Sequence, residues 1–90
     1  MERLSINNLE ECFCNATLKD KKYIGVKIEM KGFPKAEIII NDKENFGDKL
    51  TYYKKAYNED LVLKTFNGIK IVGFTYGDSF QDIQNDLIGA

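Results

Sequence analysis

Residues 61–76 read LVLKTFNGIKIVGFTY, two β-rich runs separated only by Asn67 and Gly68. A two-residue type I′ turn requires positive φ at both central positions, and Asn followed by Gly tolerates this best. The twist of such a turn also matches the twist of paired strands. The stretch therefore predicts a β-hairpin with three opposed pairs: Val62 with Gly73, Lys64 with Ile71, and Phe66 with Ile69.

This hairpin would have two apolar faces. We expect the core to lie on the face that carries Leu61, Leu63, Val72, Phe74 and Tyr76. The other face carries Val62, Phe66, Ile69 and Ile71. An exposed apolar patch of this kind marks a contact with another protein or a second copy of the chain. The alternative is that a helix covers this face, which would make a three-layer domain.

A second hairpin is predicted earlier in the chain. From Tyr23 to Lys31 apolar and polar residues alternate with period two, as in a strand with one buried face. Gly32-Phe33-Pro34 ends this strand, because proline has no N–H to donate to a ladder. The next strand would point Ala36, Ile38 and Ile40 inward, with Glu37 opposite Lys31.

Three amphipathic helices complete the pattern. The first follows a Ser5 cap, the second begins near Asn45, and the third begins at Asp78 or Ser79. The first two each carry one apolar stripe at helical spacing: Leu9, Cys12, Phe13 and Ala16, and Phe46, Leu50, Tyr53 and Tyr57. The order is α-β-β-α-β-β-α. We therefore expect residues 1–90 to form a single α+β domain, built as a single antiparallel sheet of two hairpins with helices on one face.

Composition removes most kinds of chemistry. The chain has 90 residues, no histidine and only two cysteines, Cys12 and Cys14. It therefore lacks the parts for a Ser-His-Asp triad, a Cys-His dyad, a His-liganded zinc or a four-thiolate site. No glycine-rich phosphate-binding motif is present. We expect no enzyme activity, no cofactor and no metal, with Cys12 packed as a small buried hydrophobe and Cys14 facing outward.

The N-terminus and the hydropathy pattern bear on location. MERLSINNLEE carries acidic residues where a signal peptide has a basic start and an apolar block. No apolar run approaches the roughly 20 residues that cross a bilayer. The expectation is a cytoplasmic protein that does not enter a membrane.

Two surfaces are candidates for binding. Asp78, Asp82 and Asp86 are spaced by four, which places them on one edge of the last helix. With Val62, Phe66, Ile69 and Ile71 they form the predicted contact surface for a protein partner or a homodimer. The plain alternative for the aspartates is the solvent face of an amphipathic helix, with Asp78 near the positive end of the helix dipole.

The second surface is basic. Residues 19–35 carry six lysines against two acids, although the whole chain has a net charge of −1. A nucleic-acid-binding module would use lysines for phosphates and aromatic rings for stacked bases. Its residues would be Lys21, Lys22, Tyr23, Lys27, Lys31, Phe33 and Lys35, beside Lys19. The net charge and a single arginine, Arg3, count against this alternative.

Residues 46–87 include YYKKAYNEDLVLK at 52–64 and NGIKIVGF at 67–74. This stretch resembles small uncharacterised proteins encoded by phages and prophages of low-GC Gram-positive bacteria. The resemblance carries no catalytic signature and assigns no site residues. It implies a phage-type accessory protein in the host cytoplasm that acts by protein–protein binding.

Overall fold

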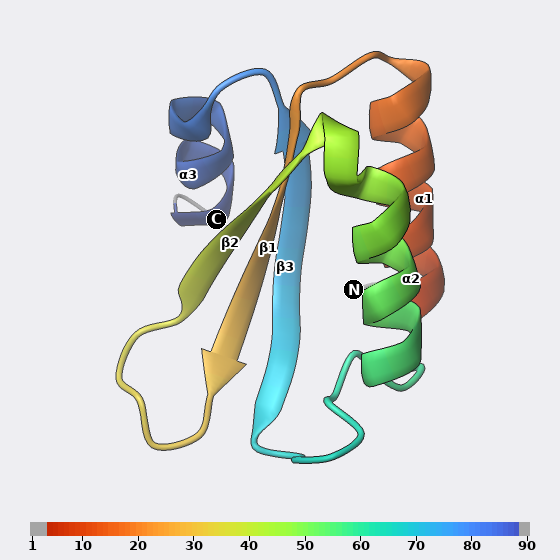
Figure 1. Ribbon diagram of the computed structural model, residues 1–90. Helices are drawn as coiled ribbons and strands as arrows, with labels where there is room; N and C mark the ends of the chain where they lie inside the picture. Colours follow the sequence, from red (N-terminus) through yellow and green to blue (C-terminus); the bar gives the residue numbers. More distant parts are fainter. Residues whose placement is uncertain (1–3, 89–90) are drawn as a thin grey trace.

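The computed structural model describes residues 4–88 as an α+β fold with one antiparallel sheet (Figure 1). The helices are α1 (Ile6–Leu18), α2 (Phe46–Ala56) and α3 (Phe80–Ile88), and a short 3₁₀ turn, η1, spans Lys43–Asn45. The strands are β1 (Tyr23–Met30), β2 (Glu37–Asp42) and β3 (Ile69–Gly77), in the spatial order β2-β1-β3. Among the described residues no helix is both long and apolar enough to cross a membrane.

The prediction of four strands in two hairpins is wrong, because residues 61–66 do not form a strand. Only two isolated bridges involve this segment, Tyr57 with Leu63 and Val62 with Lys70. It lies along the start of β3, where the Ile71 N–H donates to the Leu61 carbonyl at 2.9 Å. The sheet therefore has three strands, and β3 pairs with β1 instead of completing a second hairpin.

The predicted turn at Asn67 and Gly68 also differs. Neither residue has positive φ, so the type I′ geometry does not form. Two successive turns are present instead: the Phe66 N–H donates to the Leu63 carbonyl, and the Ile69 N–H donates to the Phe66 carbonyl. Val62 consequently lies opposite Lys70 and not opposite Gly73, a shift of three residues.

A β-bulge corrects the predicted faces of β3. Lys27 pairs with Gly73 while the next residue, Ile28, pairs with Ile71, so Val72 is the extra residue. One inserted residue reverses the side on which all following side chains lie. Ile69 and Ile71 therefore share the core face with Phe74 and Tyr76, and not the opposite face.

The register between β1 and β2 is also shifted by three residues from the prediction. Glu37 lies opposite Ile28 and not opposite Lys31. The intervening loop is longer than expected and includes Gly32 at φ +94. Because the shift is odd, Ile39 and Asn41 join the face of Ile24 and Val26, and Ile38 and Ile40 lie on the opposite face.

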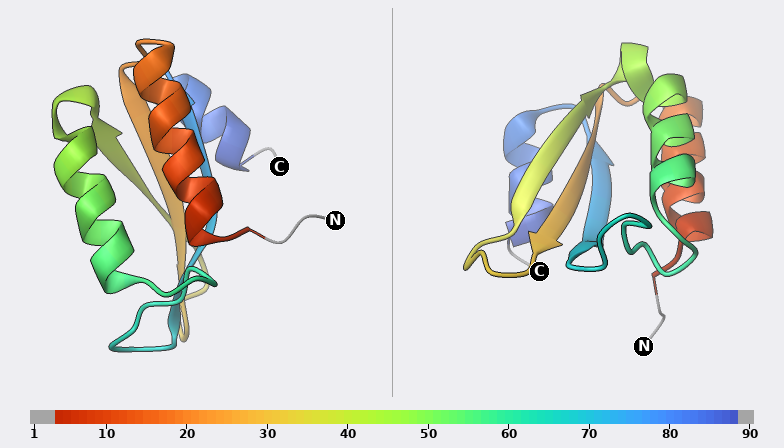
Figure 2. Two further views of the ribbon diagram at one scale, coloured as in Figure 1. Left: turned by 90° about the vertical axis from the view of Figure 1, so that its right-hand side faces the viewer. Right: turned by 60° about the horizontal axis from the view of Figure 1, so that its bottom comes forward.

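The helices cover both faces of the sheet, which corrects the expectation of helices on one face only. Figures 1 and 2 show α1 and α2 side by side on one face and α3 on the other. The main core lies under α1 and α2, where four residues of α1 pack with buried residues of β1, β3 and α2. Those α1 residues are Leu9, Cys12, Phe13 and Ala16, the stripe that the sequence predicts. A capping box of Ser5 and Asn8 begins the helix.

The layer under α3 is built on glycine. A Cβ placed on Gly25 would lie 2.2 Å from Ile83 Cγ2, so only glycine lets α3 approach β1 this closely. Ile83 is fully buried at this contact. The Lys27 Nζ donates to the Leu87 carbonyl at 3.1 Å and so satisfies a carbonyl at the end of α3.

Candidate functional site

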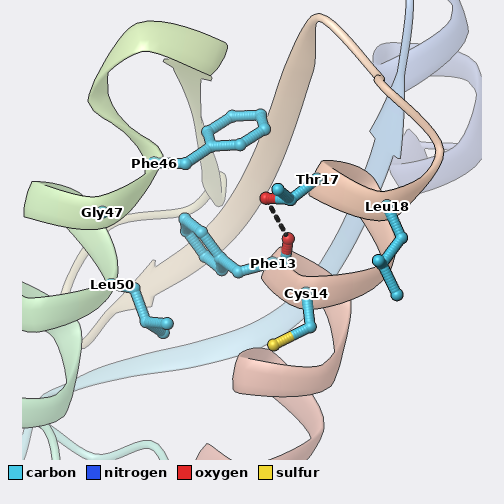
Figure 3. Close-up of a pocket in the computed structure, with 7 residues that line it drawn as sticks. All are labelled: Phe13, Cys14, Thr17, Leu18, Phe46, Gly47 and Leu50. Carbon is cyan, nitrogen blue, oxygen red and sulfur yellow. Dashed lines mark hydrogen bonds between the residues drawn. The ribbon is translucent and has the colours of Figure 1, made fainter.

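The candidate site is an apolar groove between the end of α1 and the start of α2. It has a volume of about 340 Å³ and is open to solvent. Seven residues line it: Phe13, Cys14, Thr17, Leu18, Phe46, Gly47 and Leu50. Figure 3 shows Phe13, Phe46 and Leu50 converging from the two helices, with Cys14 and Leu18 on the α1 side.

Aromatic packing forms the floor of this groove. The Phe13 and Phe46 rings meet edge to face, with centroids 5.7 Å apart. Phe13 is 2 % exposed and Phe46 is 6 % exposed, so both belong to the core as well as to the groove. Because these rings are held from below, the floor is a rigid surface and not a set of free side chains.

The walls of the groove are open for two reasons. Gly47 contributes no side chain, and a Cβ built on it would meet no atom within 4 Å. Leu18 projects from the last turn of α1 with 84 % of its surface exposed. Leu18 lies outside the buried stripe of α1. Its large apolar side chain therefore adds exposed apolar surface beside the groove.

The polar groups near the groove are already engaged. The Thr17 hydroxyl donates to the Phe13 carbonyl at 2.9 Å, within the same helix. The Lys54 Nζ and the Glu10 carboxylate, one turn below the groove on α2 and α1, form an ion pair at 2.8 Å. The groove thus presents apolar surface with no charged side chain in its lining.

The two cysteines occupy the environments that the sequence predicts. Cys12 is buried in the core, and this burial raises the pKa of its thiol to about 11. Cys14 is exposed in the lining of the groove. The chain has no histidine, so Cys14 is not part of a Cys-His dyad.

The predicted apolar contact surface is not assembled as a patch. Ile71 is 1 % exposed, and Ile69 packs against the core. Val62 is half-buried, which leaves Phe66 as the only one of the four that is largely exposed. The predicted surface is therefore wrong for Ile69 and Ile71, because the bulge at Val72 turns them inward.

The predicted acidic edge is partly used within the chain. The Asp78 carboxylate accepts from the Lys22 backbone N–H at 3.3 Å and lies 3.4 Å from the Lys21 Nζ. The Asp86 carboxylate accepts from the Thr75 hydroxyl at 3.2 Å, and Asp82 is exposed in the first turn of α3. Phe66 precedes β3 and Asp78 follows it. The apolar and the acidic parts of the predicted contact surface therefore begin at opposite ends of a strand about 30 Å long.

The basic region does not form one binding face either. Lys21 pairs with Asp78, and Lys27 holds the end of α3. The Tyr23 ring packs against Phe80 at 4.8 Å, whereas Phe33 is 65 % exposed. Tyr23 begins β1 and Phe33 lies in the loop beyond its other end, so about the length of the strand, roughly 26 Å, separates the two rings and they do not form a stacking platform.

The remaining lysines of that region are exposed but separated. Lys22 precedes β1, whereas Lys31 and Lys35 lie in the loop after it. Lys19, which also belongs to this region, donates to the Tyr76 hydroxyl at 2.7 Å. This arrangement weakens the nucleic-acid alternative, because the charge is divided between the two ends of the sheet.

Metal ligands are not clustered in the described part of the chain. Within residues 4–88 no group of three or more His, Cys, Asp or Glu side chains is placed to hold a metal ion. The groove has no such side chain apart from Cys14. Its chemistry is that of an apolar contact.

Sequence reasoning missed the groove residues because most of them also serve the core. Phe46 and Leu50 belong to the predicted apolar stripe of α2, and Phe13 belongs to that of α1. The available signal was Leu18, a large apolar residue outside the α1 stripe.

No protein family model, no curated protein and no solved structure matches this chain.

Proposed function

We propose that this chain is a non-catalytic protein-binding domain whose contact site is the groove between α1 and α2. The occupant would be an amphipathic helix of a partner protein. The observation that carries the proposal is the exposed Leu18 beside an apolar floor of Phe13, Phe46 and Leu50.

The shape of the groove favours a helix. It lies between two helices that run side by side on the sheet (Figure 2). An amphipathic helix inserts apolar side chains at i, i+3 or i+4, and i+7 into such grooves. The missing side chain at Gly47 leaves room for one of these anchors.

The chemistry of the lining favours a protein over a small metabolite. Small-molecule sites contain a few well-placed polar groups that orient the ligand. Here the Thr17 hydroxyl is bonded to a backbone carbonyl, and the other lining side chains are apolar apart from Cys14. Such a lining selects apolar bulk and supports binding rather than catalysis.

The biological setting rests on the sequence. The resemblance of residues 46–87 to phage and prophage proteins is the reason to place this binding among the accessory functions of a phage. The partner would then be a protein in the cytoplasm of the host cell.

The proposal can be tested with a displayed library of random peptides, selected separately on the wild-type protein and on Gly47→Leu. The Cβ of a leucine at position 47 would meet no atom within 4 Å, and Gly47 lines the groove, so we expect the added side chain to occupy part of it. It would also favour the helix, because leucine has a higher helix propensity than glycine. We expect wild-type selection to enrich peptides with apolar residues at helical spacing.

Those peptides should lose at least about tenfold in affinity for Gly47→Leu, which corresponds to one partly lost apolar anchor. The matched control is Lys49→Leu, which adds the same side chain about 200° around α2. Lys49 is exposed, and its replacement should leave affinity unchanged. Equal binding to wild type and Gly47→Leu, or no enrichment at all, would refute the groove as the binding site.

A further inference from the structure

The outer edge of β2 has no partner strand in the described structure. β2 pairs with β1 on one side only, and the sheet ends there. Figure 1 shows no other strand beside its outer edge. The segment reads Glu37-Ile-Ile-Ile-Asn41, and all three isoleucines are only half-buried.

The register defines which backbone groups point outward. The Lys43 N–H donates to the Lys22 carbonyl at 2.9 Å, so these two residues form a hydrogen-bonded pair across the ladder. In antiparallel sheets such pairs alternate with pairs that do not exchange bonds. Odd-numbered residues of β2 therefore bond to β1, and the N–H and C=O groups of Ile38 and Ile40 face away from it.

The centre of this edge, from Ile38 to Asn41, lacks the usual protection against pairing with another strand, and the charged residues of β2 lie only at its two ends. Natural edges carry lysine, proline, a bulge or a covering segment. The other edge of this sheet has two of these devices, the bulge at Val72 and the segment 61–63 that bonds to Ile69 and Ile71. From Ile38 to Asn41, β2 has no charged residue, no proline and no bulge.

We propose that β2 pairs with β2 of a second copy of this chain and continues the sheet across a two-fold axis. The axis would pass beside Ile39, so that Ile38 and Ile40 of one copy form hydrogen-bonded pairs with Ile40 and Ile38 of the other. Each such pair exchanges two backbone hydrogen bonds. The edge is self-complementary because the three isoleucines then meet only isoleucines.

The charges at the ends of β2 are compatible with this register. Glu37 of one copy would lie opposite Asn41 of the other, so no carboxylates face each other. Lys35 would lie opposite Lys43, but the Lys43 ammonium is already bound to the Asp20 carboxylate. The central part of the contact is uncharged in both copies.

The helices leave space for the second strand. α3 sits against glycines of β1 and β3, because Ile83 and Leu87 contact the positions of Gly25 and Gly73. It therefore lies over the centre of the sheet and not beyond the β2 edge. Pairing would bury Ile38 and Ile40 further on the α3 face, and Ile39 on the face of α1 and α2.

This contact closes on itself. Each copy has one β2 edge, and a two-fold axis uses both edges at once, so the product is a dimer and not a fibre. At the second sheet edge, segment 61–63 bonds to Ile69 and Ile71 at the start of β3, and the bulge at Val72 follows it.

The test is the mass in solution by sedimentation equilibrium, with a pair of charge variants. The 10.3 kDa chain should sediment with twice this mass as its concentration rises toward about 1 mM. Ile38→Lys/Ile40→Lys places lysines opposite lysines, and Ile38→Glu/Ile40→Glu places carboxylates opposite carboxylates. Each double variant should be monomeric, and an equimolar mixture should regain the double mass.

Recovery in the mixture shows that both variants fold and that the paired edge is β2. Val72→Lys, on the other edge of the sheet, is the matched control and should leave the dimer intact. A wild-type chain that stays at 10.3 kDa throughout this range overturns the proposal. So does a dimer that persists in both charge variants.

Discussion

Replacing Gly25 with alanine should lift α3 from the sheet. The new Cβ would lie 2.2 Å from Ile83 Cγ2 and 3.2 Å from Leu87 Cδ1, whereas ordinary contacts lie at 3.4–4 Å. α3 would have to move by about 1 Å, or Ile83 would have to leave its rotamer. Ile83 and Leu87 are the buried residues of α3, so either change loosens its attachment to the sheet.

The size of the effect follows from two opposed terms. Overpacking a well-packed site costs about 1–3 kcal/mol, with more lost if Ile83 and Leu87 become exposed. Alanine in a strand recovers only about 0.5–1 kcal/mol relative to glycine. The net expectation is a fall in the free energy of unfolding of about 0.5–2 kcal/mol, and in the Tm of roughly 2–16 °C.

The assay is urea unfolding followed by far-UV circular dichroism. Gly47→Ala is the matched control, because a Cβ there meets no atom within 4 Å and helix propensity improves by about 1 kcal/mol. Adding Ile83→Ala to Gly25→Ala removes the clashing methyl, so the two changes should cost less together than the sum of their separate costs. If Gly25→Ala is as stable as Gly47→Ala, the account of α3 packing is wrong.

Two further predictions concern buried polar groups. Burial raises the pKa of the Cys12 thiol from 9.0 to about 11 and the pKa of Tyr57 from 10.0 to about 12. Both groups therefore stay neutral in the fold at pH values where the unfolded chain ionises them. The free energy of unfolding, measured by urea titration, should not depend on these two groups below about pH 9 and should fall between pH 9 and 12. The fall should be less steep in Tyr57→Phe. A free energy that stays constant from pH 9 to 12 would contradict this prediction. Asn41 is 1 % exposed, donates to the Ile24 carbonyl at 3.1 Å and accepts from the Tyr53 hydroxyl at 3.4 Å. Asn41→Leu should lower the free energy of unfolding in urea by about 1–3 kcal/mol, because it leaves the buried Tyr53 hydroxyl without its acceptor. Adding Tyr53→Phe should recover part of this loss. If the costs of the two substitutions simply add, the two side chains are not paired.

The elements were easier to predict from the sequence than their registers. The apolar stripes of α1 and α2, the Ser5 cap and the apolar face of β1 each depend on neighbouring residues, and the structure confirms them. The other face of β1 is not in water as predicted, because Gly25 is buried against α3. The two predicted hairpin registers were each wrong by three residues. An odd shift moves every side chain to the other face, so it changes the core assignments as well.

The reason is that α3 covers the second face of the sheet. Period-two alternation identifies a register only when one face is buried and the other is in water. Ile38, Ile39 and Ile40 are each half-buried, on both faces, so the pattern does not distinguish the two registers. The uninterrupted isoleucine run is itself typical of a strand between two covered faces.

The bulge explains why the predicted apolar patch is absent. Val72 is inserted between two paired stretches, beside Gly73. A glycine inside a strand is a recognised sign of a bulge, but it does not identify which neighbour is extra. When the extra residue is not known, a strict alternation along β3 assigns Ile69 and Ile71 to the wrong face. The groove was missed for a related reason, because it depends on the spacing of two helices that only tertiary packing determines.

The most direct test of the groove as the binding site is the rate of Cys14 alkylation by iodoacetamide, with and without a peptide selected on the wild-type protein. Cys12 is buried with a raised pKa, so Cys14 is the thiol that reacts near neutral pH. At a peptide concentration of about ten times its Kd, the reaction should slow roughly tenfold. The control is Asn15→Cys in a Cys14→Ser background, because Asn15 lies on the side of α1 that faces Phe74 and Tyr76. Its rate should not change. If bound peptide leaves Cys14 as reactive as before, the partner does not occupy the α1–α2 groove.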